Sequence, residues 1–318
     1  MASPQAPRGP DGRRGGREFW AGHQPDPDWL EGAAHGSVQP EAFAAVRAGR
    51  YRRYPHLEAL AGFADHAGEL VCEVGCGLGV DGTRFIEGGA RYVGIEPSGV
   101  PARTARRTVD LLGLRGAVVQ GDATALPIAS ATVDYVYCVG VLHYVQDTAA
   151  AVREIHRVLR PGGRCLVMLH HRWSLKYYVS ILFLRRLGVS MLLVPGGTRL
   201  VRWLTGTSEE TAFAGHRAML RRHGLTYLTD RRLFLSHNTD GVGNQLSKVF
   251  SRRQVQELFA GFDGVETEVR NLYVQALPVL DRLLGPTLKE RLGRHLGWEL
   301  FVRATRLQGG DLVHGHGR

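Results

Sequence analysis

Hydrophobic and polar positions alternate in a regular order over the first half of the chain. Short apolar runs, each typical of a buried β-strand, lie at residues 70–74, 91–96, 117–120, 133–139 and 164–170. Stretches with a helical period separate them, such as residues 101–114 and 148–159. Strands that alternate with helices in this way are joined by right-handed crossovers, so the pattern predicts a parallel sheet covered on both faces.

The regular alternation stops at His171. Residues 172–250 are mixed, basic and in part very apolar, and periodicity returns at Ser251, which we expect to cap a helix over residues 252–262. Two further strands are predicted at 265–272 and 299–306, separated by a helical insert. The expected fold is therefore α/β: a Rossmann-like, doubly wound, seven-stranded sheet with a final antiparallel strand, plus a helical lid insertion.

A glycine-rich turn follows the first predicted strand, in the run VCEVGCGLG at residues 71–79. Gly75, Gly77 and Gly79 leave room for backbone to approach a ligand closely. Val80 stands where the dinucleotide pattern G-x-G-x-x-G has its last glycine. Glu73, two residues before the first glycine, would repel a pyrophosphate and attract an ammonium group. The turn therefore favours a cationic cofactor over NAD.

Acidic residues also end the next two strands. Glu96 is placed to accept hydrogen bonds from both hydroxyls of a ribose, and Asp122 from the amino group of an adenine. The fourth strand leads into the segment from Val139 to His143, where cofactor and acceptor should meet. Residues 159–163 (LRPGG) close a helix and turn tightly into the fifth strand.

Five motifs in this order carry a family resemblance: VCEVGCGLG, YVGIEPS, GDATALP, VDYVYCVGVLHYV and EIHRVLRPGG. Together they resemble the class I S-adenosylmethionine-dependent methyltransferases, in particular the ubiquinone/menaquinone-biosynthesis-like (methyltransferase type 11) group. The resemblance implies S-adenosyl-L-methionine as cofactor. It also implies that the cofactor is held by Glu73, Gly75, Gly77 and Gly79 at the methionine part, by Glu96 and Pro97 at the ribose, and by Asp122 and Ala123 at the adenine. Val139 and His143 would line the transfer site.

The resemblance is fainter outside this core. Residues 51–57 (YRRYPHL) look like the helical entry segment that covers the cofactor in one subgroup, and residues 237–251 (HNTDGVGNQLSKVFS) look like a loop of that subgroup. The subgroup usually has a proline where this chain has Gln245. The expected segments are a disordered leader (1–18), an N-terminal helical cover (19–69), the cofactor-binding core (70–171), the basic, apolar lid and acceptor-pocket insertion (172–250), the last helix and strands (251–307) and a disordered tail (308–318).

Several side chains are candidates for the chemistry and for acceptor binding. His143 is the first candidate for a general base, although a wall residue that shapes the pocket is the favoured alternative. His170 and His237 are further catalytic candidates, and strand alternation should aim one of His170 and His171 toward the pocket and the other away. The candidate acceptor contacts are Tyr144, His171, Tyr177 and Arg222.

The net charge of +10 is concentrated in one segment. Residues 172–260 carry 14 Lys and Arg against five Asp and Glu, while residues 1–171 balance at 18 of each. The insertion opens with the apolar stretch 173–187, interpreted as a buried lid helix, as a wall of an apolar acceptor pocket or, least favoured, as an interfacial membrane anchor. Its arginines are either a solvated face or the site for an amphiphilic, anionic acceptor.

The remaining features narrow the function. The four cysteines sit in or beside apolar runs and are expected to be free thiols of a cytoplasmic protein, with no metal site and no targeting or transmembrane segment. The leading hypothesis is methyl transfer to O, N or C of a small, lipophilic metabolite. The alternatives are an RNA- or tRNA-modifying methyltransferase that uses the basic insertion, although no nucleic-acid-binding module is evident, and a cofactor-binding protein without catalysis.

Overall fold

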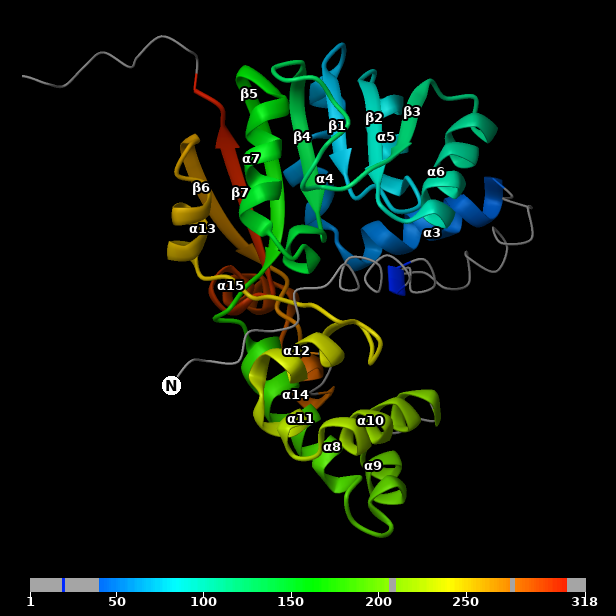
Figure 1. The fold of residues 1–318 in the computed structure, drawn as a ribbon, viewed down its shortest axis with the longest axis vertical. Coiled ribbons are helices and arrows are strands. Elements are labelled where there is room, and N and C mark those ends of the chain that lie inside the picture. The colour runs from blue at the N-terminus through cyan, green and yellow to red at the C-terminus, as the bar shows by residue number, and fades with distance from the viewer. Residues whose placement is uncertain (1–18, 21–39, 206–209, 275–277, 308–318) are drawn as a thin grey trace, which may run out of the picture.

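A computed structural model of the protein describes residues 19–20, 40–205, 210–274 and 278–307. One seven-stranded sheet forms its centre, in the order β3-β2-β1-β4-β5-β7-β6 (Figure 1). All neighbours pair in parallel except β7, which is antiparallel to both β5 and β6. The strands are β1 (Leu70–Val74), β2 (Arg91–Glu96), β3 (Gly116–Gln120), β4 (Val133–Val139), β5 (Leu159–His170), β6 (Asp263–Arg270) and β7 (Glu299–Thr305). The predicted fold class is confirmed.

The strand order places a switch point between β1 and β4. The chain runs outward from β1 through β2 to β3, then returns to build β4 and β5 on the other side of β1. Crossovers leave a crevice at such a point, outside the carboxyl ends of the strands, where ligands of doubly wound folds bind.

Helices cover both faces of the sheet because side chains alternate along its strands. In β4, Val136 and Cys138 join one core cluster. The same cluster contains Ile155 from α7 (Thr148–Val158) and Phe259, which directly follows α13 (Arg252–Leu258). Tyr135 and Tyr137 face the other way, into a cluster with residues of the N-terminal helices and α5. On this second face lie α3 (Pro40–Arg53), α4 (His56–Ala61), the 3₁₀ turn η1 (Phe63–His66) and α5 (Val80–Glu87).

The boundaries of several elements differ from those predicted. The helix expected at 101–114 is α6 (Gly99–Leu111), and Ser251 does cap α13 (Arg252–Leu258), with a full capping box, although the helix ends four residues earlier than expected. The predicted turn at 159–163 lies inside β5. Leu159 already pairs with Val133, after which the register shifts so that Arg164 pairs with Tyr135. The turn is thus an irregularity in a longer strand.

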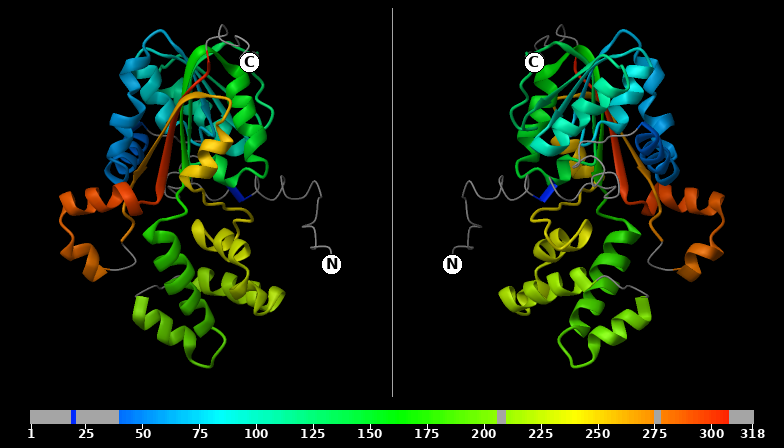
Figure 2. Two further views of the ribbon diagram at one scale, coloured as in Figure 1. Left: turned by 90° about the vertical axis from the view of Figure 1, so that its left-hand side faces the viewer. Right: turned by 90° about the vertical axis from the view of Figure 1, so that its right-hand side faces the viewer.

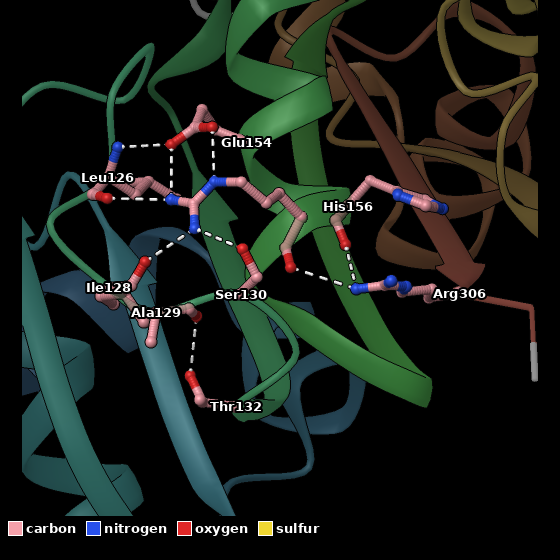
Figure 3. A network of polar contacts seen from close by, with 9 residues as sticks. Leu126, Ile128, Ala129, Ser130, Thr132, Glu154, His156 and Arg306 are labelled. Atoms are coloured by element: carbon pink, nitrogen blue, oxygen red, sulfur yellow. Dashed lines mark hydrogen bonds and ion pairs between the residues drawn. The ribbon is translucent and has the colours of Figure 1, made fainter. Parts of the chain in front are cut away.

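The connection between β3 and β4 is fixed by one arginine of α7. Arg157 donates to the carbonyl oxygens of Leu126 and Ile128 and to the hydroxyl of Ser130. It also forms an ion pair with Glu154, whose carboxylate accepts from the backbone N–H of Leu126. Figure 3 shows this network, in which backbone groups of an irregular loop find side-chain partners. The loop follows Asp122, so the network also holds the end of β3.

A helical unit extends beyond the carboxyl ends of the strands (Figures 1 and 2). It consists of η3 (Lys176–Arg185, with π-type hydrogen bonding), α8 (Arg186–Met191), α9 (Gly197–Thr205), α10 (Glu210–His223), α11 (Thr226–Thr229) and α12 (Arg231–Thr239). Its own apolar core contains Ile181, Tyr227 and Phe234, all of which are fully buried. Between β6 and β7 the predicted helical insert is present as α14 (Pro278–Leu283) and α15 (Pro286–Leu296).

The first helix of this unit is only partly the buried lid helix that its apolar sequence suggested. Lys176, Tyr177 and Ile181 are buried, but Phe183 is 63% exposed and Trp173, before the helix, is 56% exposed. The helix therefore presents one side to the core and leaves the other uncovered by the described residues. No helix in the described ranges combines the length and the apolar character that crossing a bilayer requires.

A buried ion pair fastens the N-terminal helices to the sheet. Asp81, in the first turn of α5, accepts from Arg50 at 2.7 and 2.5 Å and from the hydroxyls of Tyr51 and Tyr137 at 2.8 Å each. Burial alone would raise the pKa of Asp81. The charge and hydrogen bonds of Arg50, together with hydrogen bonds from Tyr137 and Tyr51, hold this pKa below its usual range. The carboxylate stays ionised inside the protein because all its neighbours favour that form.

Replacing Asp81 by asparagine should destabilise the protein. The free energy of unfolding should fall by about 3 kcal/mol, the lower end for a broken buried ion pair, because the Arg50 side chain keeps 21% exposure and can regain some hydration. Urea denaturation at neutral pH measures this change, with the exposed Asp110→Asn as control. Since the folded pKa is lowered, the contribution should persist above the unfolded pKa and disappear only in acid. A loss below about 1 kcal/mol would contradict the interpretation.

Candidate active site

The glycine turn after β1 has a backbone that only glycine adopts easily. Gly75, Gly77 and Gly79 have φ angles of 76°, 53° and 81°, in the left-handed region. At Gly75 a Cβ atom would also lie 2.3 Å from Cγ2 of Val141, in the segment after β4. The missing side chain therefore lets the ends of β1 and β4 approach each other. The predicted cradle of backbone is present at the switch point of the sheet.

Glu73 is buried beside this turn. Its carboxylate is 5% exposed and accepts a hydrogen bond from the hydroxyl of Tyr92 at 2.5 Å. Burial and the nearby charge of Asp81 raise the pKa of Glu73 well above its usual value, and Tyr92 and Arg50 offset only part of this rise. A buried carboxylate with a raised pKa would be stabilised in its ionised form by an additional cation beside it.

The next two acidic residues end β2 and follow β3, as predicted. Glu96 is 5% exposed and accepts from the backbone N–H groups of Gly77 at 3.1 Å and Ser98 at 2.9 Å, so it links the glycine turn to the end of β2. Burial raises the pKa of Glu96, and the backbone hydrogen bonds from Ser98 and Gly77 lower it in part. Asp122 accepts from the backbone N–H and the hydroxyl of Thr124.

The other three predicted cofactor contacts lie along the same edge. Pro97 follows Glu96 and its carbonyl oxygen accepts from Gln120 at the end of β3. Ala123 is buried, and Val139 is half-buried at the end of β4. Three acidic side chains and a left-handed glycine turn thus meet at the carboxyl ends of neighbouring strands. This donor and acceptor set fits an adenosyl cofactor that carries an ammonium group.

A buried pair of histidines lies at the ends of β4 and β5. His143, in the 3₁₀ turn η2 (Leu142–Tyr144), is 0% exposed, and its ring stacks on that of His170 with 3.5 Å between centroids. The ring of His170 stacks in turn on Trp298, at 4.1 Å. Among the described residues, neither ring nitrogen of His143 nor Nδ1 of His170 makes a hydrogen bond of normal geometry. The backbone of Met168 lies close enough to the His143 ring to raise its pKa in part, but does not satisfy it. Such buried orphan groups are rare in proteins and indicate a place for a polar ligand.

Both histidines are neutral near pH 7. Burial lowers the pKa of His143 to about 3, and the charge of Lys176 contributes to this shift. Burial, His143 and Lys176 hold the pKa of His170 well below its usual value. A neutral imidazole has one nitrogen free to accept a proton or a hydrogen bond.

The loop at 240–250 crosses these strand ends. The backbone N–H of Lys248 donates to the carbonyl oxygen of His143 at 3.0 Å, and that of Phe250 to the carbonyl oxygen of His170 at 2.8 Å. Tyr144 donates to Asp240 and its ring contacts Trp20 at 4.7 Å between centroids. Residues 237–251, which resemble a loop of the methyltransferase subgroup, therefore include the segment whose backbone bonds to both histidines.

The remaining candidate residues lie apart from the pair. His171 points to the opposite side from His170 and lines a surface cavity of about 610 Å³ with Arg172 and His295, in keeping with the predicted alternation. Tyr177 packs in the core of the helical unit. His237 bonds through Nδ1 to the carbonyl oxygen of Val242. Arg222 lies at the exposed C-terminal end of α10.

Two groups of residues at this site were missed by sequence reasoning. Trp298 and Tyr273 enclose Lys176 next to the histidine pair. The Arg50–Asp81 ion pair lies in the first turn of α5, directly after the glycine turn. For the Arg50–Asp81 pair, the family-like segment 51–57 was the available signal in the sequence. For the contacts of Lys176 with Tyr273 and Trp298 the sequence offered no signal, because more than 90 residues separate Lys176 from both rings.

Comparison with known proteins agrees with this geometry. A family model described as a methyltransferase domain matches residues 72–167. The ubiquinone biosynthesis O-methyltransferase of Ralstonia nicotianae is 30% identical over 194 residues, which cover 58% of this chain and 77% of that protein. An uncharacterized 37.1 kDa protein in transposon TN4556 of Streptomyces fradiae is 38% identical over 110 residues. That match covers 34% of this chain and 31% of the transposon protein, so the chain spans about a third of its length.

Among solved structures, an S-adenosylmethionine dependent methyltransferase from Mesorhizobium loti is similar with a TM-score of 0.46 and 18% identity, covering 79% of this chain and 97% of that one. On the relatives of similar sequence and the motifs together, the chain belongs to the class I S-adenosylmethionine-dependent methyltransferases. It is a methyltransferase whose cofactor is S-adenosyl-L-methionine.

The raised pKa of Glu73 makes cofactor affinity depend on pH. Below this raised pKa the side chain is neutral and attracts no ammonium group, so affinity for S-adenosylhomocysteine should rise as the pH is raised through it. Titration calorimetry at a series of pH values measures the slope. In Glu73→Gln the affinity should be weaker and the slope lost. A slope that is the same in both proteins would contradict a role for Glu73.

Glu96→Ala should weaken binding of S-adenosylhomocysteine. Loss of a hydrogen bond to a charged group costs about 1.5–3 kcal/mol, or roughly a 10- to 150-fold higher dissociation constant. Glu96→Gln keeps the shape and one acceptor oxygen, so its loss should be smaller. Unchanged affinity in the alanine variant would refute the expected ribose contact.

Proposed function

We propose that this enzyme methylates a small, lipophilic and anionic metabolite by in-line displacement. One observation carries the proposal: the unpartnered nitrogens of His143 and His170 lie at the same edge of the sheet as the glycine turn. An acceptor placed on these nitrogens would lie at the switch point, next to the cofactor. The helical unit has exposed apolar side chains on η3, which would suit an apolar acceptor body. Its excess of basic residues would suit an acidic group on the same acceptor.

The cofactor roles follow the arrangement of the acidic residues. Glu73 and the turn from Gly75 to Gly79 would hold the methionine part, and Glu96 with Pro97 the ribose. Asp122 and Ala123 would hold the adenine, and Val139 would line the transfer site. When bound, S-adenosylmethionine supplies an electrophilic methyl group on a sulfonium. The protein's main task is then to place the acceptor atom in line with that group, since proximity and orientation supply much of the acceleration.

His143 would accept the proton of a hydroxyl acceptor. Its ring is fixed by the stack with His170 and Trp298 and is neutral. Burial and the charge of Lys176 make it a weak base in the free protein, with a pKa of about 3, so a bound acceptor would have to raise this pKa for His143 to take the proton. His170 would orient this ring through the stack. The loop that covers the pair, with Tyr144 and Asp240 in contact, would exclude water from the acceptor.

His143→Ala should abolish turnover and leave cofactor affinity unchanged. General-base catalysis is worth about 10²- to 10⁴-fold, so kcat should fall by this factor. Methyl transfer from radiolabelled cofactor into a metabolite extract measures turnover, and calorimetry with S-adenosylhomocysteine measures affinity. His295→Ala, at the exposed end of α15, is the matched control. Retained turnover in His143→Ala would make this residue a wall of the site and not the base.

A further inference from the structure

Lys176, the first residue of η3, is an unpaired cation at the acceptor side of the site. Its side chain is 8% exposed, and its Nζ atom lies 4.5 Å from the ring centre of Tyr273 and 4.6 Å from that of Trp298. Within the described part of the chain, this ammonium group makes no hydrogen bond and no ion pair. Two aromatic rings are thus its partners, and its three N–H donors are not used.

The other two lysines of the chain are both paired. Lys248 donates to the carbonyl oxygens of Val145 and Gln146 and to the hydroxyl of Thr148, and Lys289 forms an ion pair with Asp281 at 2.8 Å. All other positions of fixed positive charge are arginines. A lysine is a compact point charge with three rotatable donors, so it can serve an anion that enters from one side.

The nearest carboxylates do not neutralise Lys176. Asp240 and Glu299 act on its pKa, but Asp240 accepts from Tyr144, and Glu299 accepts from His56 at 2.6 Å and from Asn271 at 2.7 Å. Burial outweighs both and lowers the pKa of Lys176 to about 8, so the group is still mainly charged at pH 7. A buried charge with only aromatic partners is costly, and an anion would lower that cost.

Its position joins it to the histidine pair. Trp298 contacts Lys176 with its ring and stacks on His170, which stacks on His143. The charge of Lys176 lowers the pKa of both histidines, so the three groups share one electrostatic environment. An anionic oxygen beside the ammonium would lie next to the orphan nitrogens and the aromatic wall.

We infer that the Lys176 ammonium binds an anionic oxygen of the acceptor, a carboxylate or a phenolate, and so selects acidic acceptors. This inference rests on the proposed function and names the acid-binding group of the same site. It moves the expected anion site from Arg222, on the exposed end of α10, to a buried lysine beside the candidate base. A bound anion would also lie close to the ring nitrogens that have no hydrogen-bond partner. Its charge would offset that of Lys176 and so raise the pKa of His143.

The test uses the full-length protein with radiolabelled S-adenosylmethionine and a small-molecule extract of the producing organism. The extract is first divided by anion exchange at about pH 6, where carboxylates are retained and phenols are not, and then at about pH 11, where phenols are retained as well. The variants are Lys176→Met and Lys176→Gln, with Lys289→Met as the surface-charge control. Calorimetry with S-adenosylhomocysteine shows for each variant that the cofactor site is folded.

Wild-type protein should label acceptors in the retained fractions. Acceptors retained at about pH 6 carry a group that is ionised there, as a carboxylate is, and acceptors retained only at about pH 11 carry a weaker acid, as a phenol is. Both Lys176 variants should lose about 10- to 100-fold in the rate of this labelling, with unchanged affinity for S-adenosylhomocysteine, and Lys289→Met should match wild type.

Two results would overturn the inference while leaving the proposed function intact. One is labelling confined to acceptors that neither column step retains. The other is labelling of an acidic acceptor at the wild-type rate by a folded Lys176→Met protein. No labelling of any fraction by wild type would instead contradict the proposed small-molecule function, and the inference with it.

Discussion

The close approach of β1 and β4 at their carboxyl ends is the constraint on which the site depends. It exists because Gly75 has no side chain where Val141 packs, and because the turn from Gly75 to Gly79 adopts left-handed backbone. A larger residue at Gly75 would push these ends apart. Glu73 would then move relative to His143, so one contact sets the position of the glycine turn relative to the histidine pair.

Buried polar groups in this protein are of two kinds. Asp81 has its charge and hydrogen bonds satisfied by Arg50 and two tyrosines, and it therefore stabilises the fold. His143, His170 and Lys176 are also buried, but among the described residues both ring nitrogens of His143, Nδ1 of His170 and Nζ of Lys176 make no hydrogen bond. Groups of the second kind cost stability, and proteins tolerate such a cost mainly at functional sites.

The sequence allowed the core to be predicted because its signals are local. Glu73 lies near the end of the first short apolar run, Glu96 ends the second, and Asp122 follows the third. The order of these runs determines where the three residues meet. The cap at Ser251 is likewise a local signal. Contacts of Lys176 with Tyr273 and Trp298 depend on how two distant segments pack, which no spacing in the chain encodes. The exposed side of η3 was missed for the same reason, since its apolar composition does not tell which neighbours cover it.

The antiparallel direction of β7 has a consequence for how such an enzyme can diversify. Because β7 runs against β5, its first residues lie at the edge where the parallel strands end, and Trp298 arrives there from the insert that carries α14 and α15. Two separate stretches of chain, this insert and the helical unit after β5, thus border one side of the molecule. Each can change in length or composition without altering the order of β1 to β4. Acceptor preference can therefore evolve at two loci while cofactor recognition is inherited intact.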